Sequence, residues 1–184
     1  MKTIVIYSSL SGKTKRLAEG IFNGIQATGN EVTISPIEQV ESLEEYEIIL
    51  IGYWVDKGGP DNKTKELLAK IKGKHIGLFA TLGYYADSNH GWNAIQSGLE
   101  MVKEENTVIG SYVCNGALSE ALINRFRQAK DGHHASTPQS EARWEIMKNH
   151  PTEEEISCAA QRFCERIQLV RKLTDMGESV PNIL

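Results

Sequence analysis

Apolar and polar positions follow two alternating rhythms along the chain up to residue 114. Short apolar runs, rich in β-branched residues, predict strands at 3–6, 31–35, 47–52, 74–81 and 107–114. Between the runs, apolar residues at helical spacing predict a first helix that begins near Gly12 or Lys13 and stops at 28–30, and further helices over 62–71 and 92–105. Because strands alternate with helices, the pattern predicts a parallel sheet with helices on both faces, joined by right-handed crossovers.

Residues 115–151 break this rhythm. The pattern there predicts a helix over 118–129, a loop over 131–139 and a second short helix over 141–149. A last helix then begins after Pro151, where Thr152 and Glu155 form the sequence pattern of a capping box. We interpret residues 1–184 as a single domain in which 115–151 is an extended segment between the fifth strand and the last helix.

Composition narrows the class of function. The 184 residues carry a net charge of -4, which argues against general binding of nucleic acids or membrane surfaces and fits small ligands or partner proteins. Met1–Ile4 runs directly into the first strand, so we expect no signal peptide. No apolar run approaches the length of a membrane span, and we expect a cytoplasmic protein. Cys114, Cys158 and Cys164 fit reduced structural thiols, and no residues stand at a metal-ligand spacing. We expect His90, His133, His134 and His150 at the surface.

The candidate chemistry begins at the turn Ser8–Thr14, between the first strand and the first helix. It is rich in hydroxyls and has Gly12 at the entry to the helix. Such a turn directs backbone N–H groups and the positive end of the helix dipole at one point, which suits a phosphate monoester. The turn lacks the spacing of a Walker loop and the three glycines of a dinucleotide fingerprint. The competing interpretation is a plain helix cap.

Two more loops leave the same edge of the predicted sheet. In an open parallel sheet, ligands bind outside the carboxyl ends of the strands. The loops 53–61 and 82–91 start at such ends and offer four aromatic side chains: Tyr53, Trp54, Tyr84 and Tyr85. A hydroxyl-rich turn flanked by two aromatic loops predicts a pocket for a phosphorylated planar ring.

At this point the chain resembles the flavodoxins over most of its length. Ser9–Thr14 matches the family's phosphate loop, 45–52 its third strand and 54–59 its first flavin-flanking loop. The 54–58 run and the entry 150–154 to the last helix are similar to a narrower flavodoxin-like subfamily. The resemblance implies an α/β fold, a three-layer flavodoxin-like sandwich with a five-stranded parallel sheet in the order 2-1-3-4-5, and FMN as cofactor.

The resemblance also implies which residues hold the cofactor. They are Ser9, Leu10, Ser11, Gly12, Lys13, Thr14, Trp54, Val55, Asp56, Lys57, Gly58, Leu82, Gly83, Tyr84, Tyr85 and Asp87. Lys13 departs from the more usual asparagine and would add a cation beside the phosphate. Of the adjacent tyrosines we expect one to face the ring, and favour Tyr85. Asp56 is either an ion-pair partner, which we favour, or a negative charge that lowers the potential of the flavin.

The function that follows is electron transfer, in which the cofactor supplies the chemistry and the chain contributes no catalytic residue of its own. The resemblance implies a reductase as donor and a redox enzyme as acceptor. The alternative is an FMN-dependent NAD(P)H oxidoreductase acting on a quinone, a tetrapyrrole or another small acceptor. A non-redox receiver domain is disfavoured, because Tyr7-Ser8 stands where an acidic pair would follow the first strand. The sequence leaves the oligomeric state open.

Overall fold

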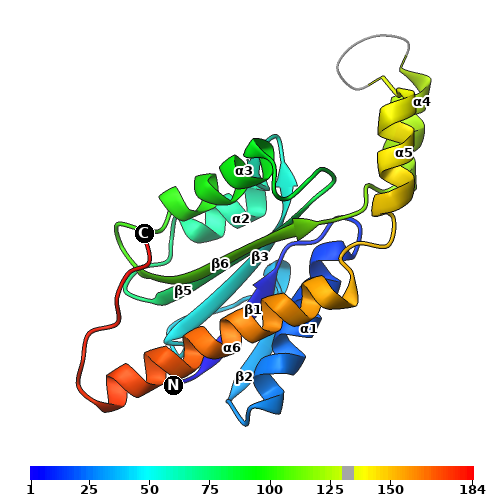
Figure 1. Cartoon of the computed structure of the whole chain (residues 1–184). Helices are drawn as coiled ribbons and strands as arrows, with labels where there is room; N and C mark the ends of the chain where they lie inside the picture. The colour runs from blue at the N-terminus through cyan, green and yellow to red at the C-terminus, as the bar shows by residue number, and fades with distance from the viewer. Residues whose placement is uncertain (130–134) are drawn as a thin grey trace.

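The computed structural model describes residues 1–129 and 135–184, and a parallel sheet forms its centre (Figure 1). Its strands are β1 (Thr3–Tyr7), β2 (Val32–Pro36), β3 (Ile48–Asp56), β5 (His75–Leu82) and β6 (Thr107–Asn115), in the order β2-β1-β3-β5-β6. A short β4 (Gly59–Pro60) pairs antiparallel with the end of β3. Because β4 lies off the main path, β5 and β6 are the fourth and fifth strands of the parallel sheet. The predicted α/β fold and the predicted strand order 2-1-3-4-5 are therefore confirmed.

Helices cover both faces of the sheet (Figure 1). On one face lie α1 (Lys13–Ala27) and α6 (Glu153–Asp175), whose apolar side chains pack on Val5, Ile48 and Leu50. On the other lie α2 (Asn62–Leu68) and α3 (Asn89–Glu100), packed on strand residues that include Ile49 and Ile51. Each central strand therefore has both faces buried, which explains its continuous apolar run. A 3₁₀ turn, η1 (Ile37–Gln39), follows β2.

The start of α6 follows the sequence prediction. Thr152 accepts a hydrogen bond from the backbone N–H of Glu155, and the Glu155 carboxylate accepts one from the N–H of Thr152. This reciprocal pair satisfies two of the N–H groups that a helix leaves without internal partners. The predicted capping box is confirmed.

The segment 53–61 differs from the prediction of a loop. β3 continues to Asp56, because Tyr53 and Trp54 find partners in Ala80 and Thr81 of β5. Tyr53 was expected at the ligand edge, which is wrong: its side chain is fully buried in the sheet's core and its hydroxyl donates to the carbonyl of Ala94, 3.0 Å away. Burial raises the pKa of this phenol. Its aromatic ring contributes to packing rather than to ligand binding.

Two helices form a hairpin that projects beyond the carboxyl end of β6 (Figure 1). They are α4 (Glu120–Gln128) and α5 (Pro138–Met147), and we call them the α4–α5 hairpin. The second helix begins before the predicted 141 because Thr137 caps it and Pro138 occupies its first turn. Of the predicted loop 131–139, residues up to 134 lie outside the described residues, as do His133 and His134.

Helix α3 also differs from the predicted range 92–105. It begins at Asn89, since the Ser88 side chain accepts a hydrogen bond from the N–H of Gly91 and caps the helix, and it ends at Glu100.

Three further observations bear on function. Within the described part of the chain, no helix has the length and apolar character needed to cross a membrane. The same residues contain no group of three or more His, Cys, Asp or Glu side chains suited to a metal ion. All three cysteines are free, with Cys114 buried, Cys158 exposed and Cys164 between the two.

Candidate functional site

The turn after β1 presents a row of backbone donors with no partner in the part of the chain that the structure describes. Gly12 is the N-cap of α1 with φ +81°, a left-handed conformation that favours glycine, and no side chain caps the helix there. The backbone N–H groups of residues 9–14 make no hydrogen bond to any residue that the structure describes. Unpaired N–H groups at a helix N-terminus form a binding site for an anion.

The hydroxyls of this turn have different surroundings. Ser11 is exposed. The Ser9 hydroxyl accepts a hydrogen bond from the N–H of Lys15 at 3.2 Å. Thr14 is buried, and its hydroxyl lies 3.0 Å from that of Thr81 on β5. The structure therefore brings Ser9 and Ser11 to the surface of the turn with the exposed Leu10, while the side chain of Thr14 points inward.

The cations at the start of α1 reach toward the end of α5 and the start of α6. The Lys13 ammonium donates to the carbonyl of Lys148 at 3.1 Å. The Arg16 guanidinium donates to the carbonyl of Pro151 at 2.6 Å and pairs with Glu153. Positive side chains are unfavourable in the first turn of a helix unless other groups compensate them. Here the end of α5 and the start of α6 provide that compensation, so Lys13 is anchored away from the free N–H groups.

The β3–β4 connection is a tight hairpin turn. Val55 pairs with Pro60, and Asp56 with Gly59. Its two central residues, Lys57 and Gly58, have φ values of +49° and +83°. Positive φ at both central positions is the requirement of a type I′ turn, which fits the twist of the strands. Trp54 stands half-buried just before this turn. The ion pair favoured for Asp56 does not form with any described residue.

The loop after β5 carries the two adjacent tyrosines. Its start, Leu82, is buried, and Asp87 is exposed. Asn115 holds the loop by accepting a hydrogen bond from the N–H of Ala86 at 2.8 Å. Tyr84 and Tyr85 meet edge to face with 5.1 Å between ring centroids.

Only one of these tyrosines shares a cleft with Trp54. That residue is Tyr84, whereas Tyr85 lines none of the clefts described here, although both side chains are exposed. The geometry thus favours Tyr84 over the predicted Tyr85 as the aromatic side chain of this loop that faces a ligand.

The α4–α5 hairpin adds residues that the sequence did not single out. Leu118, just before α4, packs so closely on Gly83 that a Cβ there would collide with its side chain. It borders a cleft of about 90 Å³ between the turn after β1 and Trp54. Arg143 and Trp144 of α5 line a larger cleft on the other side of Leu118. The one available sequence signal was the break in the strand–helix rhythm after residue 115.

Comparisons with known proteins agree with this arrangement. A family model described as a flavodoxin domain matches residues 4–164. The chain is 33% identical over 164 residues to a flavodoxin-like domain-containing protein, BilS, of Clostridioides difficile strain CD3, covering 85% of this chain and 90% of that protein. It is 31% identical over 142 residues to the BilS of Clostridium symbiosum strain WAL-14163, covering 69% and 74%.

Among solved structures, oxidised flavodoxin 1 from Bacillus cereus has a similar fold. The TM-score is 0.62 with 17% identity, covering 91% of this chain and 98% of that one.

Proposed function

The chain belongs to the flavodoxin family, and on that basis we propose that it binds FMN and carries electrons from a reductase to a redox enzyme. We also propose that residues 1–184 form one domain, of which 115–151 is an extension. FMN would supply the redox chemistry, since it accepts and releases one or two electrons.

The observation that carries this proposal is the set of N–H groups at residues 9–14 that have no hydrogen-bond partner among the described residues. They lie at the carboxyl edge of the sheet, where open parallel sheets bind their ligands. A phosphate monoester would accept hydrogen bonds from these groups and from the hydroxyls of Ser9 and Ser11. The backbone of Gly12 leaves this approach open, since among the described residues no atom beyond its two chain neighbours lies within 4 Å of the position of its missing Cβ.

The flavin ring would lie beyond the phosphate, along the two loops that follow β3 and β5. Trp54 and Tyr84 supply aromatic faces for it. The Lys57–Gly58 turn stands at its edge and supplies backbone groups without a bulky side chain at Gly58. We propose that the remaining predicted residues would contribute through their backbone or by packing: Leu10, Lys13, Thr14, Val55, Asp56, Leu82, Gly83, Tyr85 and Asp87.

The test compares FMN with riboflavin, which lacks the phosphate. Replacing Ser11 by glutamate (Ser11→Glu) puts a carboxylate among the free N–H groups and repels the phosphate. We expect FMN affinity to fall by about tenfold or more, as charge-assisted hydrogen bonds are lost, with riboflavin affinity little changed. Ser179→Glu makes the same substitution on the exposed tail and serves as the control. Equal losses for the two flavins, or a protein that does not bind FMN, would contradict the proposal.

A second candidate function is an FMN-dependent NAD(P)H oxidoreductase acting on a quinone, a tetrapyrrole or another small acceptor. The observation in its favour is the cleft of about 1010 Å³ beside the flavin loops, which has room for a second molecule. Steady oxidation of NAD(P)H by the FMN-loaded protein alone would favour this function. Reduction only through a partner reductase, with accumulation of a one-electron reduced form, would favour the carrier.

A further inference from the structure

The large cleft lies between the α4–α5 hairpin and the flavin loops. The β3–β4 turn and the loop after β5 form one wall, and α4 and α5 form the other. Its volume of about 1010 Å³ exceeds the cleft of about 690 Å³ on the opposite side of the hairpin. It also stands at the upper end of the range of ~300–1,000 Å³ that is usual for small-molecule sites. We call it the hairpin cleft. The flavin ring is proposed to lie along Trp54 and Tyr84, so a second molecule would occupy the side of the cleft along α4 and α5.

The hairpin cleft is positive although the chain as a whole is negative, with a net charge of -4. Lys57, Arg125 and Arg143 line it from three different elements, and Asp56 is the one carboxylate among the described residues of its lining. None of these three cations forms an ion pair with a residue that the structure describes. The cleft therefore has positive charge available for a ligand.

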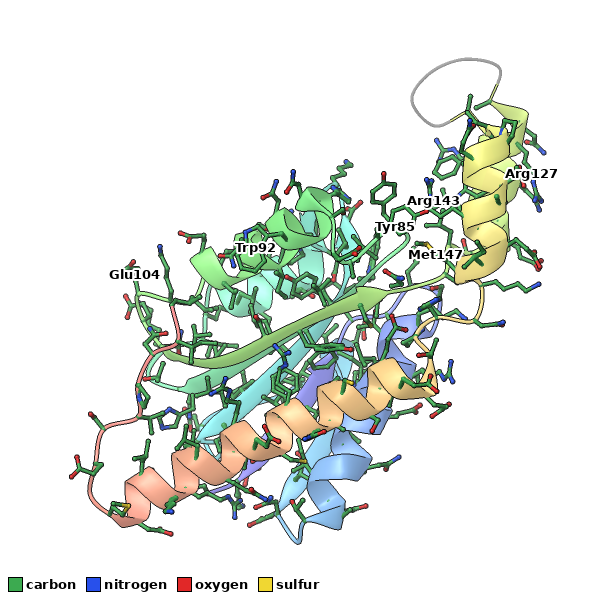
Figure 2. All side chains as sticks on the ribbon, viewed as in Figure 1. Tyr85, Trp92, Glu104, Arg127, Arg143 and Met147 are labelled. Carbon is green, nitrogen blue, oxygen red and sulfur yellow. The ribbon has the colours of Figure 1, made fainter. Side chains whose placement is uncertain are left out.

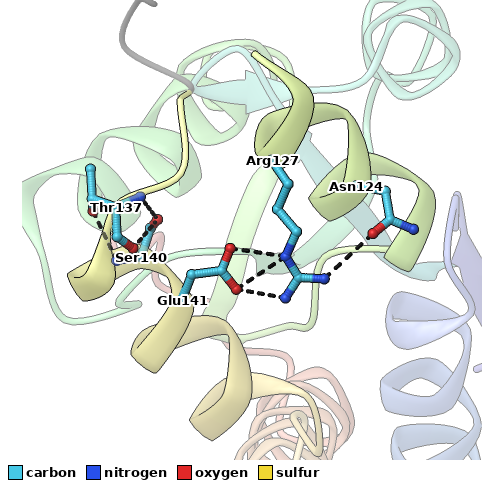
Figure 3. Close-up of polar contacts among 5 residues, drawn as sticks. All are labelled: Asn124, Arg127, Thr137, Ser140 and Glu141. Atoms are coloured by element: carbon cyan, nitrogen blue, oxygen red, sulfur yellow. Dashed lines mark hydrogen bonds and ion pairs between the residues drawn. The ribbon is translucent and has the colours of Figure 1, made fainter. Parts of the chain in front are cut away.

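The carboxylates of α5 are already paired elsewhere. Glu141 accepts hydrogen bonds from the Arg127 guanidinium of α4, the shortest at 2.6 Å (Figure 3). Glu145 pairs with Lys148. In Figure 2, Arg127 lies on one side of the hairpin and Arg143 on the side nearer to Tyr85. The two helices thus present a neutralised face and a positive face.

Aromatic rings and unsatisfied donors lie together at the positive face. The Arg143 guanidinium stands 4.8 Å from the centre of the Tyr84 ring, and the rings of Phe126 and Trp144 are 5.9 Å apart and 31° from parallel. Arg143 Nε and Trp144 Nε1 are buried without an acceptor among the described residues. Buried donors in native proteins normally have a partner, so two on successive lining residues call for a ligand with acceptor atoms.

We propose that the hairpin cleft binds a planar aromatic carboxylate, as a ligand additional to the flavin. The ring would stack beside Phe126 and Trp144 of the hairpin, because Trp54 and Tyr84 are assigned to the flavin ring. The carboxylate would take charge-assisted hydrogen bonds from Arg143 and Arg125. Both arginines present a planar fork that matches a carboxylate. The position of this ligand beside FMN rests on the proposed function, whereas its binding to the arginines does not.

Two probes of equal ring size test the proposal: anthracene-9-carboxylate and 9-anthracenemethanol. Equilibrium dialysis against the FMN-loaded chain gives the affinity for each. We expect the carboxylate to bind about tenfold more tightly than the alcohol, by the charge-assisted bonds, and added salt to weaken only the carboxylate. Equal affinities would overturn the proposal.

Matched variants locate the site. The double variant Arg125→Gln and Arg143→Gln is expected to abolish the preference for the carboxylate, with the alcohol unaffected. Arg127→Gln changes the same residue type on the other face of the same hairpin and should preserve the preference. Equal effects from Arg127→Gln would overturn the proposal, as would a preference that survives the double variant. Arg125→Gln alone, at an exposed side chain, gives a partial loss if the double variant does not fold.

The FMN absorbance separates this inference from the proposed function. Carboxylate binding without FMN binding would refute the proposed function alone. Bound FMN without a preference for the carboxylate would refute this inference alone.

Discussion

Helices α6 and α4 both repeat apolar residues at helical spacing, yet only α6 buries them. Ala159, Phe163, Ile167 and Val170 of α6 pack on the sheet with 0–1% exposure, whereas α4 has no buried residue. The apolar side chains of α4 meet α5 and border clefts instead, as Phe126 does beside Trp144. Apolar residues at helical spacing thus form part of the core in α6 and the wall of a cleft in α4. The reason is that α6 packs on the apolar face of the sheet, whereas α4 packs on a single helix, α5.

The largest effect is expected at Phe163, which packs edge to face on Phe79 with 6.0 Å between ring centroids. Phe163→Ala leaves a cavity and should lower the free energy of unfolding by about 3–5 kcal/mol. Phe126→Ala in the hairpin is the control, and a much smaller loss is expected because that ring is half-buried. Urea denaturation followed by circular dichroism measures both. Similar losses would mean that the hairpin is part of the cooperative core.

An intermediate effect is expected where the sheet meets α6. A Cβ on Gly77 would stand 2.6 Å from side-chain atoms of Leu50 and Phe163. Gly77→Ala therefore overpacks the core and should lower the free energy of unfolding by about 1–3 kcal/mol.

The control for Gly77→Ala is the same substitution at Gly110, on the neighbouring strand β6. Gly110 is the register partner of Gly77 on β6. A Cβ added to Gly110 would stand 3.5 Å from its nearest side-chain atoms, which is ordinary van der Waals contact, so Gly110→Ala should be tolerated. Thermal melts of the two variants provide the comparison. A more damaging Gly110→Ala would contradict this account of the packing.

The smallest effect is expected from the ion pair that joins the two hairpin helices. The hydrogen bond from Arg127 lowers the pKa of Glu141. A lowered pKa stabilises the fold above the ordinary pKa of a glutamate, and this contribution disappears as the pH falls through the lowered value. Melting temperatures of the protein and of Glu141→Gln should therefore differ slightly at neutral pH and converge in acid. A difference that is constant across that range would rule out the pair as its source.

Several features followed from the sequence because they depend on local pattern. The apolar runs located the five main strands, since a strand covered on both faces has no polar alternation to disguise it. Thr152 and Glu155 located the start of α6, since a capping box satisfies backbone N–H groups only a few residues away. The turn at Gly12 was located in the same way, by a strand followed by hydroxyls, glycine and a helical pattern.

Features that depend on distant partners were beyond the sequence. Tyr53 looked like a residue of a ligand loop until β5 extended β3 and the carbonyl of Ala94 accepted its hydroxyl. Likewise, Lys13 reached the end of α5 rather than the turn that precedes it.

The two faces of the α4–α5 hairpin show most clearly what the sequence determined and what only the tertiary structure decided. The sequence determined that the chain builds a parallel sheet with a hydroxyl-rich turn at its carboxyl edge, because strand and helix propensity are written in neighbouring residues. It could not determine that Arg127 meets Glu141 while Arg125 and Arg143 line a cleft without a carboxylate partner among the described residues. Which arginine pairs with a carboxylate depends on how α4 and α5 dock. The energy of a charge pair depends on the distance between the charges, and the tertiary structure sets that distance even for charges close in sequence.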